Sequence, residues 1–382
     1  MVLEALTAAL DELAGLEPAD LADRDTFAEL HRLSDRFEAV LTRAAGAFDS
    51  SGDWQLDKAR TSAAWISNVC HRPHATTKAE IALARALRHL PHAEAAWLDG
   101  DIGAPQVKVL ARARRPATAD RLAEDEAMLV GHAITMHFRH FTRLVAYWTQ
   151  HADPDGEDEK ARDQHEQRNF HLSQSFQDMF YADGTFDPIN GTIVNDELSR
   201  LEKELFDADW TDARHRLGRE PTVVDLPRTP AQRRADALVE MAIRSATAPA
   251  DGRRPEPLFT VVVGWETFNG RICQLANGTV VAPGALIPWL KAAWIERIVF
   301  GSPSRVIDVG VTRRLFTGAT RRALEVRDQE CFHPLCDEPS GQCQGDHIVP
   351  HAADGPTTQD NGRMACGFHN RDRNQRPPPD PP

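Results

Sequence analysis

Residues 331–376 read CFHPLCDEPSGQCQGDHIVPHAADGPTTQDNGRMACGFHNRDRNQR, and this stretch decides how the end of the chain can fold. It begins with Cys331 and Cys336 and closes with Cys366 and His369. Thiolate and imidazole are ligands that zinc prefers, and structural zinc sites take paired ligands from two turns. The segment between the pairs is short and polar, so a metal cross-link would supply the stability that apolar burial cannot. These four residues, the zinc quartet, predict a structural zinc site.

The alternative for the same segment is one disulfide with an unpaired cysteine and histidine. The chain has six cysteines, and Cys70 and Cys273 stand isolated in the sequence, which is not the pattern of a disulfide framework. The spacing therefore favours metal binding. Cys343 is expected to pack beside the metal without binding it.

A second group of polar residues lies between the two halves of the zinc quartet. The Asp346 carboxylate is a hard oxygen ligand suited to Mg²⁺, and the His347 imidazole can accept a proton from water near neutral pH. The Asn361 amide can orient the imidazole or pin the loop that carries it. His333 and His351 are nearby, and we expect both to be exposed loop residues.

The segment resembles an HNH endonuclease module, a ββα-metal nuclease, through Asp346-His347-Ile348-Val349-Pro350, Asn361 and the Cys-x2-His element. The resemblance implies that His347 is the general base, Asp346 a ligand of the catalytic cation and Asn361 the middle motif residue. Asn370, directly after His369, falls at the last motif position as a second cation ligand. That position is often histidine, and an amide oxygen is a weaker ligand for Mg²⁺ in many sites.

This resemblance implies metal-dependent hydrolysis of phosphodiester bonds, with double-stranded DNA as the partner. Mg²⁺ or another divalent cation would stabilise charge on the phosphate and the leaving oxygen. Zinc would take no part, because a closed four-ligand shell leaves no open position. The alternative is a zinc-stabilised nucleic-acid-binding protein with weak or no catalysis, which the departure at Asn370 keeps open.

Charge is distributed unevenly along the chain. The net charge of −13 opposes binding to phosphates, but basic residues gather beside the cysteines. The arginines expected to contact DNA are Arg313, Arg314, Arg321, Arg322 and Arg327 before the zinc quartet, and Arg371 and Arg373 after it. The alternative for the first five is an ordinary solvated basic helix face.

Nothing in the sequence predicts export or membrane insertion. The first residues carry acidic side chains and no basic segment, unlike a signal peptide, and no apolar run is long enough to span a bilayer. Together with the isolated cysteines, this predicts a cytoplasmic protein with no membrane partner.

Most of the chain before residue 250 shows helical periodicity. Apolar residues recur at helical spacing at Leu3, Leu6, Leu10 and Leu13, and again at Phe27, Leu30, Leu33, Phe37, Val40 and Leu41. Further helices are expected over 61–69, 77–90 with Thr77 as its capping residue, 93–98, from Pro105 through Val107, Val109 and Leu110, and over 119–132 and 135–151. This region could act as a scaffold for a partner, and copies of the chain could associate through it.

Two segments of the helical region carry a second resemblance. ARTSAAWISNV (59–69) and ALARALRHLPHAEAAWLDGDIGAPQVKVLARA (82–113) resemble the uncharacterised helical domain that precedes HNH modules in repeat-family proteins of actinobacteria. The resemblance runs to about residue 246 and supports the nuclease prediction through the pairing of domains.

The expected fold is mainly α with small β elements (α+β). Strands are predicted at 170–173 and 179–181 with a turn at 182–185, at 258–263, and as a pair at 298–300 and 305–309; helices are predicted at 283–294 and 318–328. The predicted domains are a helical domain of unknown role over 1–250, a strand-containing connector with a basic helix over 251–330, the nuclease module over 331–376 and a disordered tail over 377–382.

Overall fold

The computed structural model describes residues 1–247, 258–263, 273–275, 278–286, 294–299, 315–353 and 355–375. The described part is mostly helical with small sheets, which confirms the predicted fold class. The chain divides into two compact units, residues 1–153 and 154–382. The predicted domain boundary near residue 250 lies outside the described residues.

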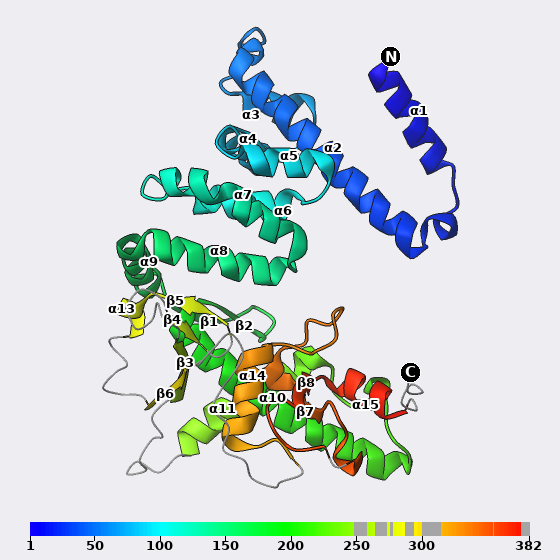
Figure 1. Cartoon of the computed structure of the whole chain (residues 1–382), viewed down its shortest axis with the longest axis vertical. Coiled ribbons are helices and arrows are strands. Elements are labelled where there is room, and N and C mark those ends of the chain that lie inside the picture. Colours follow the sequence, from blue (N-terminus) through cyan, green and yellow to red (C-terminus); the bar gives the residue numbers. More distant parts are fainter. Residues whose placement is uncertain are drawn as a thin grey trace. The chain divides into compact units, whose positions relative to one another are not determined.

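Unit 1 is entirely helical (Figure 1). Its α-helices are α1 (Val2–Ala14), α2 (Arg24–Ser51), α3 (Ser62–Val69), α4 (His74–Leu87), α5 (Pro91–Asp99), α6 (Ala104–Ala113), α7 (Ala119–Thr135) and α8 (Phe138–Ala152). Short 3-10 turns, η1 (Pro18–Leu21) and η2 (Asp53–Gln55), flank α2. Each predicted helix of this region is therefore confirmed.

The start of α4 differs from the prediction. The helix begins at His74 after Pro73, so Thr77 is inside it and not at its cap. The Thr77 hydroxyl is fully buried and donates to the Pro73 carbonyl at 3.0 Å. The Thr77-x-x-Glu80 pattern therefore lies inside a helix that starts earlier, directly after Pro73.

The core of unit 1 is a continuous apolar cluster between α2 and α4–α8. Its largest fully buried side chains include Trp97, Leu110, Leu129 and Phe141. Buried area of this kind stabilises a domain by roughly 25 cal/mol per Å² of apolar surface. Unit 1 therefore has the core of an independently folding helical domain.

Unit 2 begins with helices and a hairpin. Its first elements are α9 (Pro154–Glu166), β1 (Asn169–Gln174), β2 (Phe180–Thr185), α10 (Pro188–Leu217), η3 (Val223–Asp225) and α11 (Pro230–Thr247). The predicted hairpin is confirmed, but its predicted turn is wrong, because residues 182–185 belong to β2 and the chain reverses over 175–179. Asp178, with φ of 63°, sits in this reversal.

A small sheet follows in the order β5-β4-β3-β6. Its strands are β3 (Leu258–Val263), β4 (Cys273–Leu275), β5 (Val280–Val281) and β6 (Trp294–Val299), with α13 (Pro283–Leu286) between the last two. Gly278, with φ of 83°, permits the tight return from β4 to β5. The predicted strand at 305–309 and residues 287–293 of the predicted helix lie outside the described residues.

The C-terminal module has α14 (Gly318–Asp328), β7 (Gln344–His347), β8 (Gly362–Ala365) and α15 (Gly367–Gln375). β7 and β8 are antiparallel, and two 3-10 turns, η5 (Ser340–Gln342) and η6 (His351–Ala353), flank β7. Phe316 packs so close to the sheet that a Cβ at Gly345 or Gly362 would lie 2.7 Å from it. Two glycines thus let an aromatic ring lie directly on the strands.

Candidate metal centre

The zinc quartet is assembled in three dimensions. Its four ligand atoms all lie within 4.8 Å of one another. Cys366 Sγ is 3.2 Å from His369 Nδ1 and 3.9 Å from Cys336 Sγ, and Cys331 Sγ is 3.4 Å from the same nitrogen. The first pair of ligands follows α14, and the second pair lies at the start of α15.

Backbone hydrogen bonds hold the two halves of the cluster together. The Phe332 amide donates to the Met364 carbonyl at 2.8 Å, which fastens the first cysteine segment to β8. The Cys366 amide donates to Cys331 Sγ at 3.3 Å, and the His369 amide donates to Cys366 Sγ at 3.5 Å. Such donors stabilise negative charge on sulfur, so the cluster is built for thiolates.

Three thiols and one imidazole nitrogen match the four-coordinate shell of structural zinc. The disulfide alternative is wrong for this segment, because Cys331, Cys336, Cys343 and Cys366 are all free. Burial raises the pKa of Cys336 to about 11, so metal binding must displace a proton from it. The cluster is therefore consistent with a structural zinc site.

Cys343 packs against the zinc quartet as expected. It is 2% exposed, lies in the same apolar cluster and donates to the Glu338 carbonyl at 3.6 Å. Burial strongly raises the pKa of its thiol. A neutral thiol bonded to a carbonyl is a packing group, and Cys343 stays outside the set of four ligand atoms.

His347 ends β7, and its ring contacts one aromatic and one hydroxyl side chain. Its Nε2 lies 2.9 Å from Thr357 Oγ1, and its ring centroid lies 4.5 Å from that of Phe316. His351 is the next ring, at 5.7 Å. The imidazole is half-buried, on the same side of β7 as Phe316.

Asp346 takes part in an ion pair across the sheet. It stands directly opposite Arg363 in the β7–β8 register, and its Oδ2 accepts from Arg363 Nε at 3.0 Å. The guanidinium carbon also lies 3.5 Å from the centroid of the Phe332 ring. Because successive strand residues point to opposite faces, this contact places Asp346 on the face away from His347.

Asn361 pins the loop that follows His347. Its Oδ1 accepts from the Val349 amide at 2.8 Å, and its Nδ2 donates to the Val349 carbonyl at 3.1 Å and the Pro356 carbonyl at 2.8 Å. The side chain is buried. The Asn361 amide was predicted either to orient the imidazole or to pin the loop, and these contacts correspond to pinning the loop.

Asn370 of α15 bonds to a side chain of β7. Its Nδ2 donates to Gln344 Oε1 at 2.6 Å. Gln344 and Asp346 are two residues apart in β7, so their side chains lie on the same face of the strand. The two predicted cation ligands, Asp346 and Asn370, contact Arg363 and Gln344, and their binding of a cation stays a prediction.

The arginines predicted to contact DNA divide into two groups. Arg327 donates to the carbonyls of Gln359 and Gly362, both at 2.7 Å, and Arg321 pairs with Glu325 and donates to the Cys343 carbonyl. These two have structural contacts within the module. Arg322 is half-buried, Arg371 is exposed, and Arg313, Arg314 and the Arg373 side chain lie outside the described residues.

Sequence reasoning missed Thr357, Arg363 and Phe316. Arg363 could have been found, because an antiparallel register that places His347 opposite Gly362 also places Asp346 opposite Arg363. Thr357 and Phe316 lie ten and thirty-one positions from His347, with no local pattern that joins them. His333 differs from expectation in one respect, because its ring stacks on the His369 ring at 4.0 Å.

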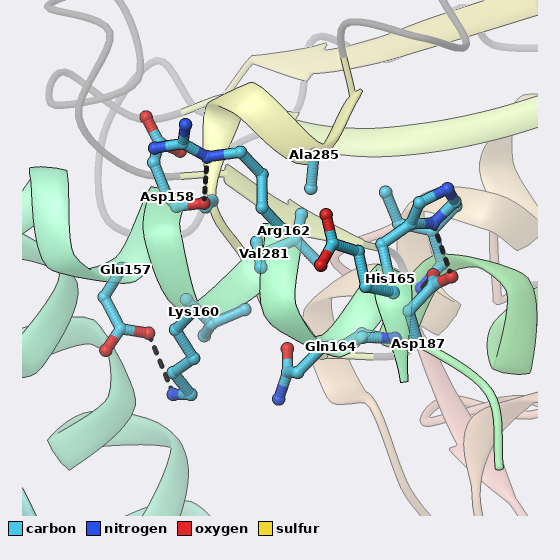
Figure 2. A pocket seen from close by; sticks show the side chains of 15 residues that line it. Glu157, Asp158, Lys160, Arg162, Gln164, His165, Asp187, Val281 and Ala285 are labelled. Carbon is cyan, nitrogen blue, oxygen red and sulfur yellow. Dashed lines mark hydrogen bonds and ion pairs between the residues drawn. The ribbon is translucent and has the colours of Figure 1, made fainter. Parts of the chain in front are cut away.

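A separate cavity of about 490 Å³ lies in unit 2 between α9, the start of α10 and residues 280–285 (Figure 2). His165 Nδ1 lies 3.0 Å from Asp187 Oδ2 in its wall. Burial raises the pKa of Asp187, but hydrogen bonds from Asn190 and His165 outweigh it and hold that pKa below its ordinary value. Lys160 pairs with Glu157, so much of this lining is neutralised internally.

The family described as a domain of unknown function, DUF222, matches residues 24–328. The chain belongs to the DUF222 family. This match ends at the last residue of α14 and so stops before the zinc quartet, and no HNH domain is detected. It agrees with the predicted resemblance of the helical region.

The DUF222 chain is also similar to the uncharacterized protein Rv3776 of Mycobacterium tuberculosis (strain ATCC 25618 / H37Rv). The two are 24% identical over 414 residues, which cover 94% of this chain and 76% of that protein. No solved structure matches the chain. No helix among the described residues has the length and hydrophobicity needed to cross a membrane.

Proposed function

We propose that residues 331–376 form an HNH-like endonuclease that hydrolyses DNA phosphodiester bonds, with His347 as general base. The observation that supports this most is the placement of His347 at the end of β7, in a module where the zinc quartet, β7, β8 and α15 have the order of a ββα nuclease. Membership of the DUF222 family is compatible with this proposal, but the family description assigns no activity to its members.

The surrounding residues fit the role of a proton acceptor at His347. Phe316 packs against the ring and the Thr357 hydroxyl bonds to Nε2, so both hold the imidazole that would accept a proton from the attacking water. Asn361 holds the segment that leads to Thr357 through Val349 and Pro356. Held rings and loops lower the cost of reaching a reactive geometry.

The zinc quartet would act at a distance from the reaction. It joins the segment after α14 to the start of α15, and Asn370 on α15 bonds to Gln344 on β7. Zinc would thereby fix the strand that carries His347. With four protein ligands it would have no open position for a phosphate.

A divalent cation is the second component that the resemblance to HNH nucleases implies. A divalent ion would neutralise charge on the phosphate and the leaving oxygen. Asp346, its predicted ligand, is bonded to Arg363, and we assign no step of the reaction to a cation. Cleavage is therefore measured both with and without added Mg²⁺ or Mn²⁺.

The Asp346–Arg363 ion pair favours a second candidate function, a zinc-stabilised module that binds nucleic acid without cleaving it. In such a module Arg363 and Arg371 would meet phosphates, and Asp346 would only orient Arg363. This candidate predicts binding that weakens steeply with salt and does not respond to added Mg²⁺.

The test is cleavage of plasmid and of high-complexity genomic DNA, with and without Mg²⁺ or Mn²⁺. The proteins are the wild type, His347→Ala and the control His215→Ala, which changes an exposed histidine of α10. Zinc content is measured in each by mass spectrometry. Cleavage by wild type and control but not by His347→Ala, with equal zinc in all three, supports the nuclease.

Arg363→Met separates the two candidates further. It removes the charge beside Asp346 while keeping an apolar side chain against Phe332. If the wild type cuts neither DNA but binds it in a salt-dependent way, and Arg363→Met binds it more weakly, the binding module replaces the nuclease as the conclusion.

A further inference from the structure

The first helix of the chain has an apolar side that is largely exposed among the described residues. None of its thirteen residues is buried, and Figure 1 shows it joined to the start of α2 and standing apart from the other helices of unit 1. Val2, Leu3 and Leu10 are 84%, 76% and 53% exposed. At about 100° per residue the apolar residues of α1 share one side. This α1 stripe consists of Val2, Leu3, Leu6, Leu10 and Leu13.

α2 is apolar on two sides, of which only one is buried. The inner side packs small residues into unit 1, namely Ala39, Thr42, Ala45 and Gly46. Large residues lie on another side of the same helix. This α2 stripe consists of Phe27, Leu30, Leu33, Phe37, Val40 and Leu41. A helix that is apolar on two sides normally has neighbours on both.

The exposure of the α2 stripe is large. Phe27, Phe37 and Val40 are 57%, 45% and 51% exposed, and Leu41 is 39% exposed. At its far end the stripe continues into a cavity of about 440 Å³, where Phe37 and Leu41 meet Leu83 of α4. The surface is thus a continuous apolar strip that ends in a hollow.

The combined area of the two stripes is that of an interface. Eight large apolar side chains of the two stripes, between 39% and 84% exposed, offer on the order of 800 Å², the area that one partner buries in a standard complex. Monomers rarely leave a contiguous apolar surface of this size in water. Something is therefore expected to cover both stripes.

The dimensions of the stripes point to a second copy of the chain. α1 has thirteen residues and is about 20 Å long, and the α2 stripe from Phe27 to Leu41 spans about 21 Å. Each copy offers one helix and one matching strip, which is the condition for a closed two-fold interface. The protein thus carries both halves of the contact.

The charges beside the stripes agree with this pairing. α1 carries Glu4, Asp11 and Glu12 and no basic residue. Arg24 at one end of the α2 stripe and Lys108 at the cavity have no ion-pair partner in the part of the chain that the structure describes. An acidic helix laid along the α2 stripe would place carboxylates near these two cations.

We propose that the protein is a two-fold dimer in which α1 of each copy lies on the α2 stripe of the other. The four helices, two from each copy, form the interface. This proposal concerns unit 1 and is independent of the activity proposed for the C-terminal module.

The test is the mass of the full chain by light scattering across roughly 1–100 µM. The expected mass is twice the chain mass of 42.4 kDa. Leu3→Asp/Leu10→Asp changes only α1, which supports no core, and Phe37→Asp changes the α2 stripe. Each is expected to weaken dimerisation on the order of 100-fold or more and give the monomer mass.

Val69→Asp is the matched control, because it places the same charge on a side chain of unit 1 that is 54% exposed and lies outside both stripes. It should leave the dimer intact. A wild-type chain that is monomeric throughout the range overturns the proposal and indicates that α1 docks on its own α2. A dimer that survives Leu3→Asp/Leu10→Asp overturns it as well.

Discussion

Unit 1 and the C-terminal module are held together by different physical means. The core of unit 1 joins nineteen buried residues, almost all aliphatic or aromatic. The core of the module joins six buried residues, and three of them are cysteines. The first is stabilised by apolar area alone, and the second is too small for that.

This difference implies that the two regions should fail under different treatments. Removing metal should affect only the module, whereas removing a buried ring should affect only unit 1. The predictions below test that separation, beginning with the largest expected effect.

Loss of zinc should unfold the module and leave unit 1 intact. Structural zinc contributes about 10–16 kcal/mol in small zinc domains at pH 7, far more than the apolar cluster around Phe316 and Leu324 can supply. We expect a strong chelator, or Cys366→Ser, to abolish amide protection over residues 331–370. Hydrogen exchange read by mass spectrometry measures both regions in one experiment.

Cys70→Ser is the control for the zinc prediction, since Cys70 is an exposed free thiol in unit 1. It should keep one zinc per chain, while Cys366→Ser should keep less than a tenth of that. If amide protection of residues 331–370 persists in zinc-free protein, the module does not depend on zinc for its fold. The proposed difference between the module and unit 1 is then wrong.

A deletion in the core of unit 1 should give the opposite result. Phe141 is fully buried within the apolar cluster. Phe141→Ala is expected to lower the free energy of unfolding of unit 1 by about 3–5 kcal/mol, through lost transfer energy and a cavity. Urea unfolding measures the loss, and the zinc content should stay at the wild-type value.

Leu56→Ala provides the comparison for Phe141, because Leu56 is 82% exposed. Its cost should stay within about 0.5 kcal/mol. A fall in zinc content in Phe141→Ala would show that the two regions depend on each other for stability.

The difference between unit 1 and the C-terminal module also explains which features of the fold were predictable from the sequence. Helical periodicity located every helix of unit 1, because long amphipathic segments carry their signal locally. The zinc quartet was also predictable, because ligand spacing is local within each half. The boundaries were less certain, as Thr77 and the turn of the β1–β2 hairpin show.

The contacts of individual polar side chains could not be predicted from the sequence. Asp346 was expected to bind a cation, yet the register of β7 and β8 places Arg363 opposite it. Arg327 was expected to meet DNA, yet it donates to two carbonyls of the module. Such choices depend on contacts between residues seventeen to thirty-five positions apart, which composition and periodicity do not encode.

The smallest predicted effects concern two aspartates that cap helices, one in each unit. Asp23 caps α2 of unit 1 and accepts from the amides of Asp25 and Thr26. Asp187 caps α10 of unit 2, accepts from two amides in the same way and also pairs with His165. Asp187 is buried, whereas Asp23 lies on the surface.

Removal of either cap should destabilise only its own unit. Asp187→Ala is expected to cost about 1 kcal/mol at pH 7, and Asp23→Ala less, because water replaces its hydrogen bonds. The pKa of Asp187 in the folded state lies below its ordinary value of 3.8, so its contribution is complete above pH 3.8 and is lost as the pH falls through the folded pKa. Urea unfolding at pH 7, 5 and 3.5 should therefore show the gap between wild type and Asp187→Ala beginning to narrow only in the most acidic sample. A gap that stays constant down to pH 3.5 would mean that the carboxylate of Asp187 contributes no charge-dependent stability to unit 2, and that apolar packing alone fixes the start of α10.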